Sequence, residues 1–148
     1  MHILDTITIT FAGLMVGNEL AVSAFVNPAV WRLESGPQAQ GSSILARSLG
    51  RVMPFWYSLC LSLLAVECFL HRHQAALAPL LAATLIWVGV IVFTICMLVP
   101  INNRIASLDV ALPTPGWKHD HKKWDSLHRM RILLLAVALL ALTYALVA

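Results

Sequence analysis

An acidic side chain lies deep inside the first apolar run of the chain, where its charge would be costly. Glu19 is followed by Ser23 and Asn27 at intervals of four residues, so the three side chains share one face of a helix. A carboxylate at that depth must be neutral or paired with a cation. We therefore expect Glu19 to handle a proton or bind a ligand; a protonated Glu19 that only joins helices is the alternative.

The last apolar run begins with an aromatic, an imidazole and a guanidinium group on one face. Trp124, His128 and Arg131 are spaced by four and three residues, which makes them neighbours on a helix. If the spans are antiparallel, several polar groups reach the same depth and should share one pocket, covered by Trp31, Trp117 or Trp124. These polar groups are Asn27, Asn102, Asn103, His128 and Arg131.

A metal centre is a competing interpretation of the same helix. His121, Asp125 and His128 are also spaced by four and three residues, and His/carboxylate sets bind zinc, copper or iron. His and Asp are equally common where a helix enters the interface, so we expect no metal and no other cofactor, although metal and haem stay open. Three cysteines inside apolar runs lack CxxC spacing and are interpreted as buried thiols: Cys60, Cys68 and Cys96.

The elements that must position these groups are four membrane spans. Hydrophobic residues make up 59% of the chain and charged residues 11%, against roughly a quarter charged in soluble domains. The spans are predicted at about 6–30, 52–70, 75–100 and 128–147, near the ~20 residues that cross a bilayer. We expect an all-α, four-helix transmembrane bundle forming a single domain over 1–148, with a short interfacial helix between the first two spans.

The charge distribution predicts an orientation. Nine of the ten basic residues lie in 32–51 and 104–131, and loops rich in Lys and Arg stay cytoplasmic. Both termini are then periplasmic, in what we expect to be a bacterial inner membrane. The net charge of +3 suits anionic lipid headgroups rather than nucleic acid, and whether the chain forms a homo-oligomer stays open.

Three sequence blocks appear in the order of the spans. They are Gly17-Asn18-Glu19 followed by Phe25-Val26-Asn27-Pro28, then Val99-Pro100-Ile101-Asn102-Asn103-Arg104-Ile105-Ala106, and Trp117 followed by Trp124, His128 and Arg131. Together they resemble the anthrone oxygenase-like membrane proteins, many of whose bacterial members have no assigned function. The resemblance covers nearly the whole chain.

The resemblance implies oxidation of an activated polycyclic or phenolic, lipophilic substrate by dioxygen in an intramembrane pocket. The residues it carries over are Glu19, Asn27, Asn102, Asn103, His128 and Arg131. We expect His128 to act as the base, Arg131 with an asparagine to hold the oxyanion, and Trp31 and Trp124 to flank a planar substrate. The alternatives are a non-enzymatic module that binds a quinone, haem or partner helix, and a metal-dependent membrane enzyme.

Overall fold

The computed structural model describes residues 2–109 and 111–147, and within them the regular structure is entirely helical. Two helical stretches contain a π-turn, a wider turn with one extra residue. The elements are α1 (His2–Ala21), the π-turn η1 (Val22–Val26), α2 (Asn27–Trp31), α3 (Ser35–Leu70), α4 (Leu77–Phe93), the π-turn η2 (Thr94–Leu98), α5 (Val99–Ala106) and α6 (Trp117–Val147). The last predicted span, 128–147, lies within α6, and residues 1, 110 and 148 of the predicted domain fall outside the described residues.

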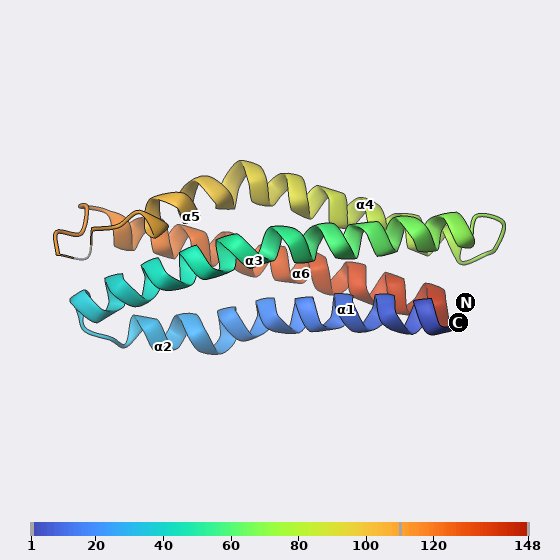
Figure 1. Ribbon diagram of the computed structural model, residues 1–148, viewed down its shortest axis with the longest axis horizontal. Helices are drawn as coiled ribbons and strands as arrows, with labels where there is room; N and C mark the ends of the chain where they lie inside the picture. Colours follow the sequence, from blue (N-terminus) through green and yellow to red (C-terminus); the bar gives the residue numbers. More distant parts are fainter. Residues whose placement is uncertain (1, 110, 148) are drawn as a thin grey trace.

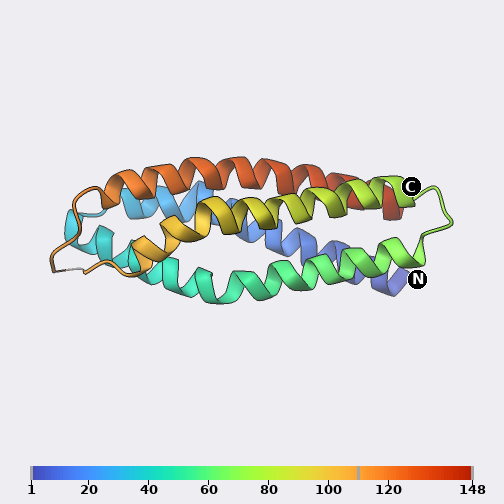
Figure 2. The ribbon, with the colours of Figure 1, turned by 90° about the horizontal axis from the view of Figure 1, so that it is seen from above.

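These elements form an elongated antiparallel bundle of four long helical rods. The rods are α1–η1–α2, α3, α4–η2–α5 and α6. Both termini and the α3–α4 link lie at one end, and the α2–α3 turn and α5–α6 loop lie at the other (Figure 1). The rods run side by side for most of their length, as the second view also shows (Figure 2). Contacts join α1 to α3 and α6, and α4 to α3 and α6. The predicted all-α, four-helix bundle is confirmed.

Each rod is long and apolar enough to cross a membrane. The four candidate spans in the described residues are Ile3–Trp31, Ser35–Leu70, Leu77–Ala106 and Trp117–Val147. Large apolar side chains such as Phe55, Leu85 and Leu133 are exposed on the outside of the bundle, where lipid rather than water would cover them. The chain therefore has the architecture of a multi-pass membrane protein.

The expected interfacial helix is wrong, because α3 runs without a break from Ser35 to Leu70. Its first half is held inside the bundle by small and polar residues that are buried: Gln38, Ala39, Ser42, Ser43 and Ala46. Such residues let a second helix approach closely. Arg47 fixes the same region from outside by donating from Nε to the Ala106 carbonyl oxygen at 2.8 Å.

Both π-turns precede a proline. Proline has no amide hydrogen and cannot donate to the carbonyl four residues earlier, and here the chain widens by one residue just before Pro28 and Pro100. The amide of Asn27 donates to the Val22 carbonyl, and the amide of Val99 donates to the Thr94 carbonyl. The first span therefore continues past Pro28 to Trp31, close to its predicted end near residue 30.

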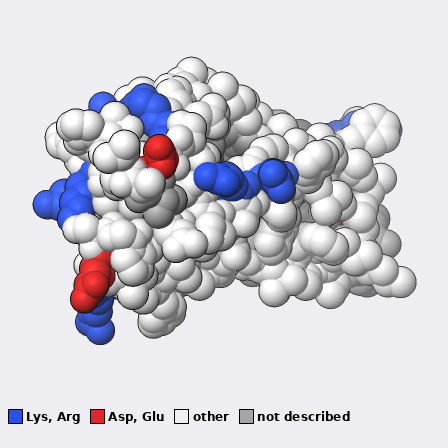
Figure 3. Space-filling view, turned by 60° about the vertical axis from the view of Figure 1, so that its left-hand side comes forward, with Lys and Arg blue, Asp and Glu red and all other residues white. Residues whose placement is uncertain are grey.

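Charged side chains gather at the end of the bundle that carries the α2–α3 turn and the α5–α6 loop. Lys and Arg are prominent there, and the visible flank beyond them is mostly uncharged (Figure 3). Arg104 forms a two-pronged ion pair with Asp120, at 2.7 and 2.9 Å, and Lys118 donates to Ser35 Oγ at 3.1 Å. This end is where we expected the polar site to open.

Candidate active site

A buried ion pair joins the first and last rods. Arg131 Nη2 on α6 lies 2.5 Å from Glu19 Oε2 on α1, and these residues are 6% and 2% exposed. The short charge-assisted contact keeps the pair neutral as a whole, which is the condition for holding either charge in an apolar interior. Of the two states that the sequence left open for Glu19, neutral or paired with a cation, the contact favours a pair with Arg131.

His128 lies against both members of this pair. Its Nε2 is 3.1 Å from the main-chain oxygen of Glu19, and because a carbonyl only accepts, Nε2 must carry the proton. Its Nδ1 then holds the lone pair, 2.9 Å from Arg131 Nη2 and 3.2 Å from Glu19 Oε2. The contacts thus select the neutral Nε2–H tautomer, and a proton arriving at Nδ1 would find the Glu19 carboxylate beside it.

Two hydroxyl groups complete the polar cluster. Tyr57 on α3 donates to Glu19 Oε1 at 3.1 Å, and Arg131 Nη1 donates to Thr94 Oγ1 in η2 at 3.4 Å. Arg131 Nε is buried and has no hydrogen-bond partner. A buried guanidinium with a spare N–H can donate to an oxygen atom of a ligand.

This cluster forms part of the wall of a cavity of about 220 Å³. Most of the wall is apolar, with Leu49, Met53 and Leu98 among its members, and Asn18, Glu19, Tyr57, Thr94, Asn102, His128 and Arg131 provide its polar part. Both π-turns reach it, through Val22 and through Thr94. An apolar cavity with a few converging polar groups is the usual form of a small-molecule site.

Two further predicted residues also line this cavity. The Trp124 ring stacks on His128 with 4.5 Å between centroids and 15° between planes. Asn102 donates from Nδ2 to the Ala46 carbonyl at 3.0 Å, an approach that Gly50 permits, because a Cβ there would lie 3.1 Å from Asn102 Nδ2. Trp124 and Asn102 therefore have fixed orientations beside the ion pair.

The structure places the other predicted residues away from this cavity. Asn27 donates to Asp125 Oδ1 at 2.7 Å, nearer the charged end. Trp31 stacks on His121 with centroids 4.8 Å apart, and Asn103 is exposed on α5. The single pocket expected for all the asparagines is thus divided, and only Asn102 of the three shares a wall with His128.

The metal interpretation of α6 is not favoured by the contacts. His121 Nδ1 lies 3.3 Å from Ser42 Oγ, Asp125 accepts from Asn27 and Arg129, and His128 faces Glu19. These three residues share a helix face but have separate partners. In the part of the chain that the structure describes, their ligand atoms do not form a metal-sized group.

Sequence reasoning missed Tyr57 and Thr94. Both lie within apolar runs, where a tyrosine or threonine is unremarkable unless its hydroxyl needs a buried partner. For Tyr57 the available signal was Glu19 itself, since a buried carboxylate accepts more hydrogen bonds than one arginine supplies. Only the packing of α3 against α1, and of η2 against α6, identifies which hydroxyls reach the ion pair.

Comparison with known proteins identifies related sequences. The sequence model of a family described as anthrone oxygenase matches residues 43–141. The match includes Tyr57, Asn102, Trp124, His128 and Arg131, whereas Glu19 precedes it. No curated protein and no solved structure matches the chain.

Proposed function

Because the chain belongs to the anthrone oxygenase family, we propose that it oxidises an anthrone-like or phenolic, lipophilic substrate with dioxygen in the cavity beside His128. The observation that carries this proposal is the buried Glu19–Arg131–His128 cluster at the wall of an apolar cavity. Such a site provides a base and cationic donors in surroundings that contain little water, which strengthens electrostatic interactions.

The cavity favours a compact, planar substrate. Its volume of about 220 Å³ is below the roughly 300–1,000 Å³ of sites for drug-sized ligands. We propose that the substrate enters from the lipid and lies against Trp124, with its oxygen accepting from Arg131 Nε. A guanidinium donor would stabilise an enolate or phenolate oxygen more than the neutral form, and so would lower the cost of removing a proton.

In the first step, the lone pair of His128 Nδ1 takes a proton from the substrate carbon opposite the carbonyl group. Arg131 Nη2 donates to both His128 Nδ1 and Glu19 Oε2. It can therefore give up its hydrogen bond to Nδ1, which leaves the Nδ1 lone pair available for the proton. The imidazolium formed would donate from Nδ1 to Glu19 Oε2, 3.2 Å away. Glu19 in this proposal stabilises the protonated base, and Tyr57 orients Glu19.

In the second step, the substrate anion reduces dioxygen. One electron passes to dioxygen, and the resulting superoxide and substrate radical combine to form a carbon–oxygen bond. The peroxide oxygen takes the proton back from His128. The same carbon then loses its second hydrogen as a proton, a carbonyl forms, and the oxygen–oxygen bond breaks to release hydroxide, so the products are a quinone and water. The dioxygen supplies all the oxidising equivalents.

We place the basic end of the bundle in the cytoplasm of a bacterial cell and the two termini in the periplasm. The support is the gathering of Lys and Arg at one end of the bundle, which the positive-inside tendency assigns to the cytoplasm. The active cavity then lies in the cytoplasmic half of the inner membrane. An alkaline phosphatase reporter fused to the C-terminus should be active, and an inactive one would reverse the orientation.

Oxygen uptake by the purified protein with 1,8-dihydroxyanthrone, corrected for the spontaneous rate, tests the proposal. His128→Gln should lower the catalysed rate by about 10²-fold or more, the usual contribution of a general base. His121→Gln is the matched control, because it changes a buried histidine of α6 that does not line the cavity. Wild-type uptake no faster than the spontaneous rate, or full activity of folded His128→Gln, would contradict the proposal.

A further inference from the structure

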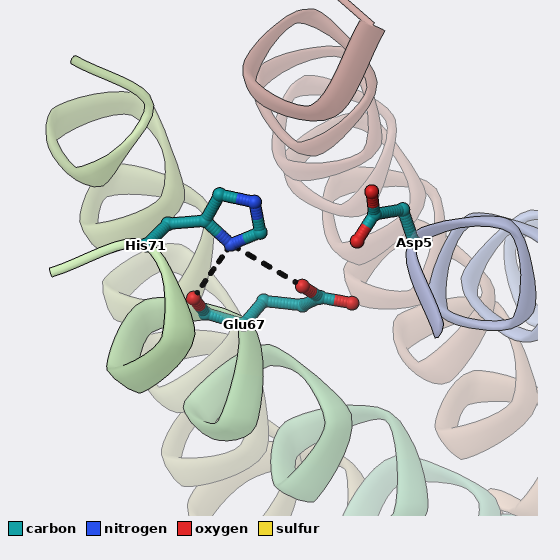
Figure 4. A group of neighbouring side chains, drawn as sticks. All are labelled: Asp5, Glu67 and His71. Carbon is teal, nitrogen blue, oxygen red and sulfur yellow. Dashed lines mark hydrogen bonds and ion pairs between the residues drawn. The ribbon is translucent and has the colours of Figure 1, made fainter. Parts of the chain in front are cut away.

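A second buried polar group lies at the opposite end of the bundle, beside the termini. It contains Asp5 of α1, Glu67 of α3 and His71 of the α3–α4 link, which are 8%, 0% and 5% exposed. Each offers one ligand atom, and the three atoms lie within 4.8 Å of one another. Figure 4 shows Asp5 facing Glu67 and His71 across the gap between the helices.

The hydrogen bonds of His71 leave one of its ring nitrogens able to bind a metal. His71 Nδ1 lies 3.0 Å from the main-chain oxygen of Glu67; a carbonyl only accepts, so Nδ1 is protonated and Nε2 keeps its lone pair. A backbone carbonyl that holds the other nitrogen of a histidine is the usual support of a metal ligand.

One carboxylate oxygen of Glu67 is likewise held by a hydrogen bond, while the other points toward His71. Thr8 donates to its Oε1 at 2.8 Å, whereas its buried Oε2 accepts no hydrogen bond and lies 3.5 Å from His71 Nδ1. An unsatisfied carboxylate oxygen in a fully buried residue is costly. The neighbouring Arg72 does not compensate it, since Arg72 donates to the Phe69 carbonyl and lies over the Phe69 ring.

We propose that Asp5, Glu67 and His71 bind one divalent transition-metal ion, for which zinc is the natural probe. The ion would be held by two carboxylate oxygens and one imidazole nitrogen, a donor set that suits Zn²⁺. It would place a divalent cation between two buried carboxyl groups in an apolar interior, where uncompensated negative charge is costly, and it would tie α1 to the end of α3. The site is remote from His128 and does not depend on the oxidation chemistry.

Zinc titration of the full, detergent-purified chain after EDTA treatment tests this site. Wild-type protein should bind one Zn²⁺ per chain by calorimetry. Glu67→Gln keeps the shape of the side chain and the acceptor for Thr8 but removes the charge, and it should weaken binding at least tenfold. His73→Gln is the matched control, because His73 is an exposed histidine two residues beyond His71, and its affinity should be unchanged.

Zinc X-ray absorption of the wild-type complex gives a second readout that does not depend on a variant folding. It should report a single histidine and oxygen ligands at about 2.0–2.2 Å, without sulfur. Three results would each overturn the proposal: no stoichiometric binding by wild-type protein, equal affinity of folded Glu67→Gln, or a coordination shell with sulfur or several histidines. The first of these would leave Glu67 as a neutral, packing carboxyl group.

Discussion

Arg131 connects most of the polar atoms of the candidate active site. Its guanidinium contacts Glu19, His128 and Thr94, and its Cζ lies 5.6 Å from the centre of the Tyr57 ring. A lysine could supply the charge but not the planar fork of donors. We therefore expect Arg131 to be both a structural and a substrate-binding residue, so that its replacement affects stability and turnover together.

Arg131→Gln should destabilise the bundle by about 3–5 kcal/mol, because it leaves Glu19 buried without its counter-ion. Glu19→Gln should have a similar cost, because it leaves the Arg131 guanidinium buried without its counter-ion. The double variant should be less destabilised than the sum of the two, since a neutral amide pair leaves no unpaired charge. Unfolding in mixed detergent micelles measures these free energies, and strictly additive losses would show that the pair is not coupled.

The sequence located the charged members of this cluster but not all their partners. The helical rise and an antiparallel order predicted Asn27, Asn102, Asn103, His128 and Arg131 at one depth. The structure instead brings Glu19 to the level of His128 and Arg131, and Asn27 lies beside Asp125. Rotation about each helix is harder to predict. Asn102 and Asn103 are adjacent and so point about 100° apart, and only Asn102 lines the cavity. Tyr57 was missed because nothing in an apolar run marks which hydroxyl faces a carboxylate.

At the scale of helices, the close crossing of α3 and α5 fixes one wall of the cavity. Gly50 leaves room for the Asn102 amide, which donates to the Ala46 carbonyl one turn earlier on α3. A methyl group at Gly50 would meet Asn102 Nδ2 at 3.1 Å, so either the amide or the helix must shift. The position of Asn102 thus depends on a glycine in the facing helix.

Gly50→Ala should raise the KM for the anthrone several-fold, with a smaller change in kcat, because it displaces a wall residue and leaves the base in place. Its stability should change little, since the gain in helix propensity of about 1 kcal/mol offsets the crowding. Gly89→Ala is the matched control, because a Cβ there meets no atom within 4 Å. Equal kinetics of the two variants would contradict a role for this crossing.

The helix boundaries show where local sequence patterns stop being informative. The Gly- and Ser-containing segment before Val52 suggested a separate interfacial helix, yet its small residues are buried and α3 is continuous. Likewise, a proline usually interrupts a helix, yet the chain accommodates Pro28 with a π-turn and continues to Trp31. In both cases tertiary packing overrides a local signal that is weak by itself.

For the whole molecule, composition and charge were sufficient to predict four antiparallel spans. They could not predict which helices are neighbours, because every lipid-facing surface is similarly apolar. The observed packing puts a buried histidine and an ion pair beside one cavity in the charged half of the bundle, and a second carboxylate and histidine group at the far end. The two groups are separate enough to be tested independently.

The central claim is that turnover takes place in the cavity beside His128, and filling that cavity tests it most directly. Leu49→Trp adds bulk to the cavity wall and leaves both residues of the ion pair unchanged, and Leu133→Trp makes the same change on the lipid-facing surface of α6. The measurement is oxygen uptake with 1,8-dihydroxyanthrone by both folded variants. We predict that Leu49→Trp loses at least nine-tenths of the catalysed rate, on the order of 1.4 kcal/mol or more in activation free energy, whereas Leu133→Trp keeps the wild-type rate. Full activity of Leu49→Trp would contradict the account.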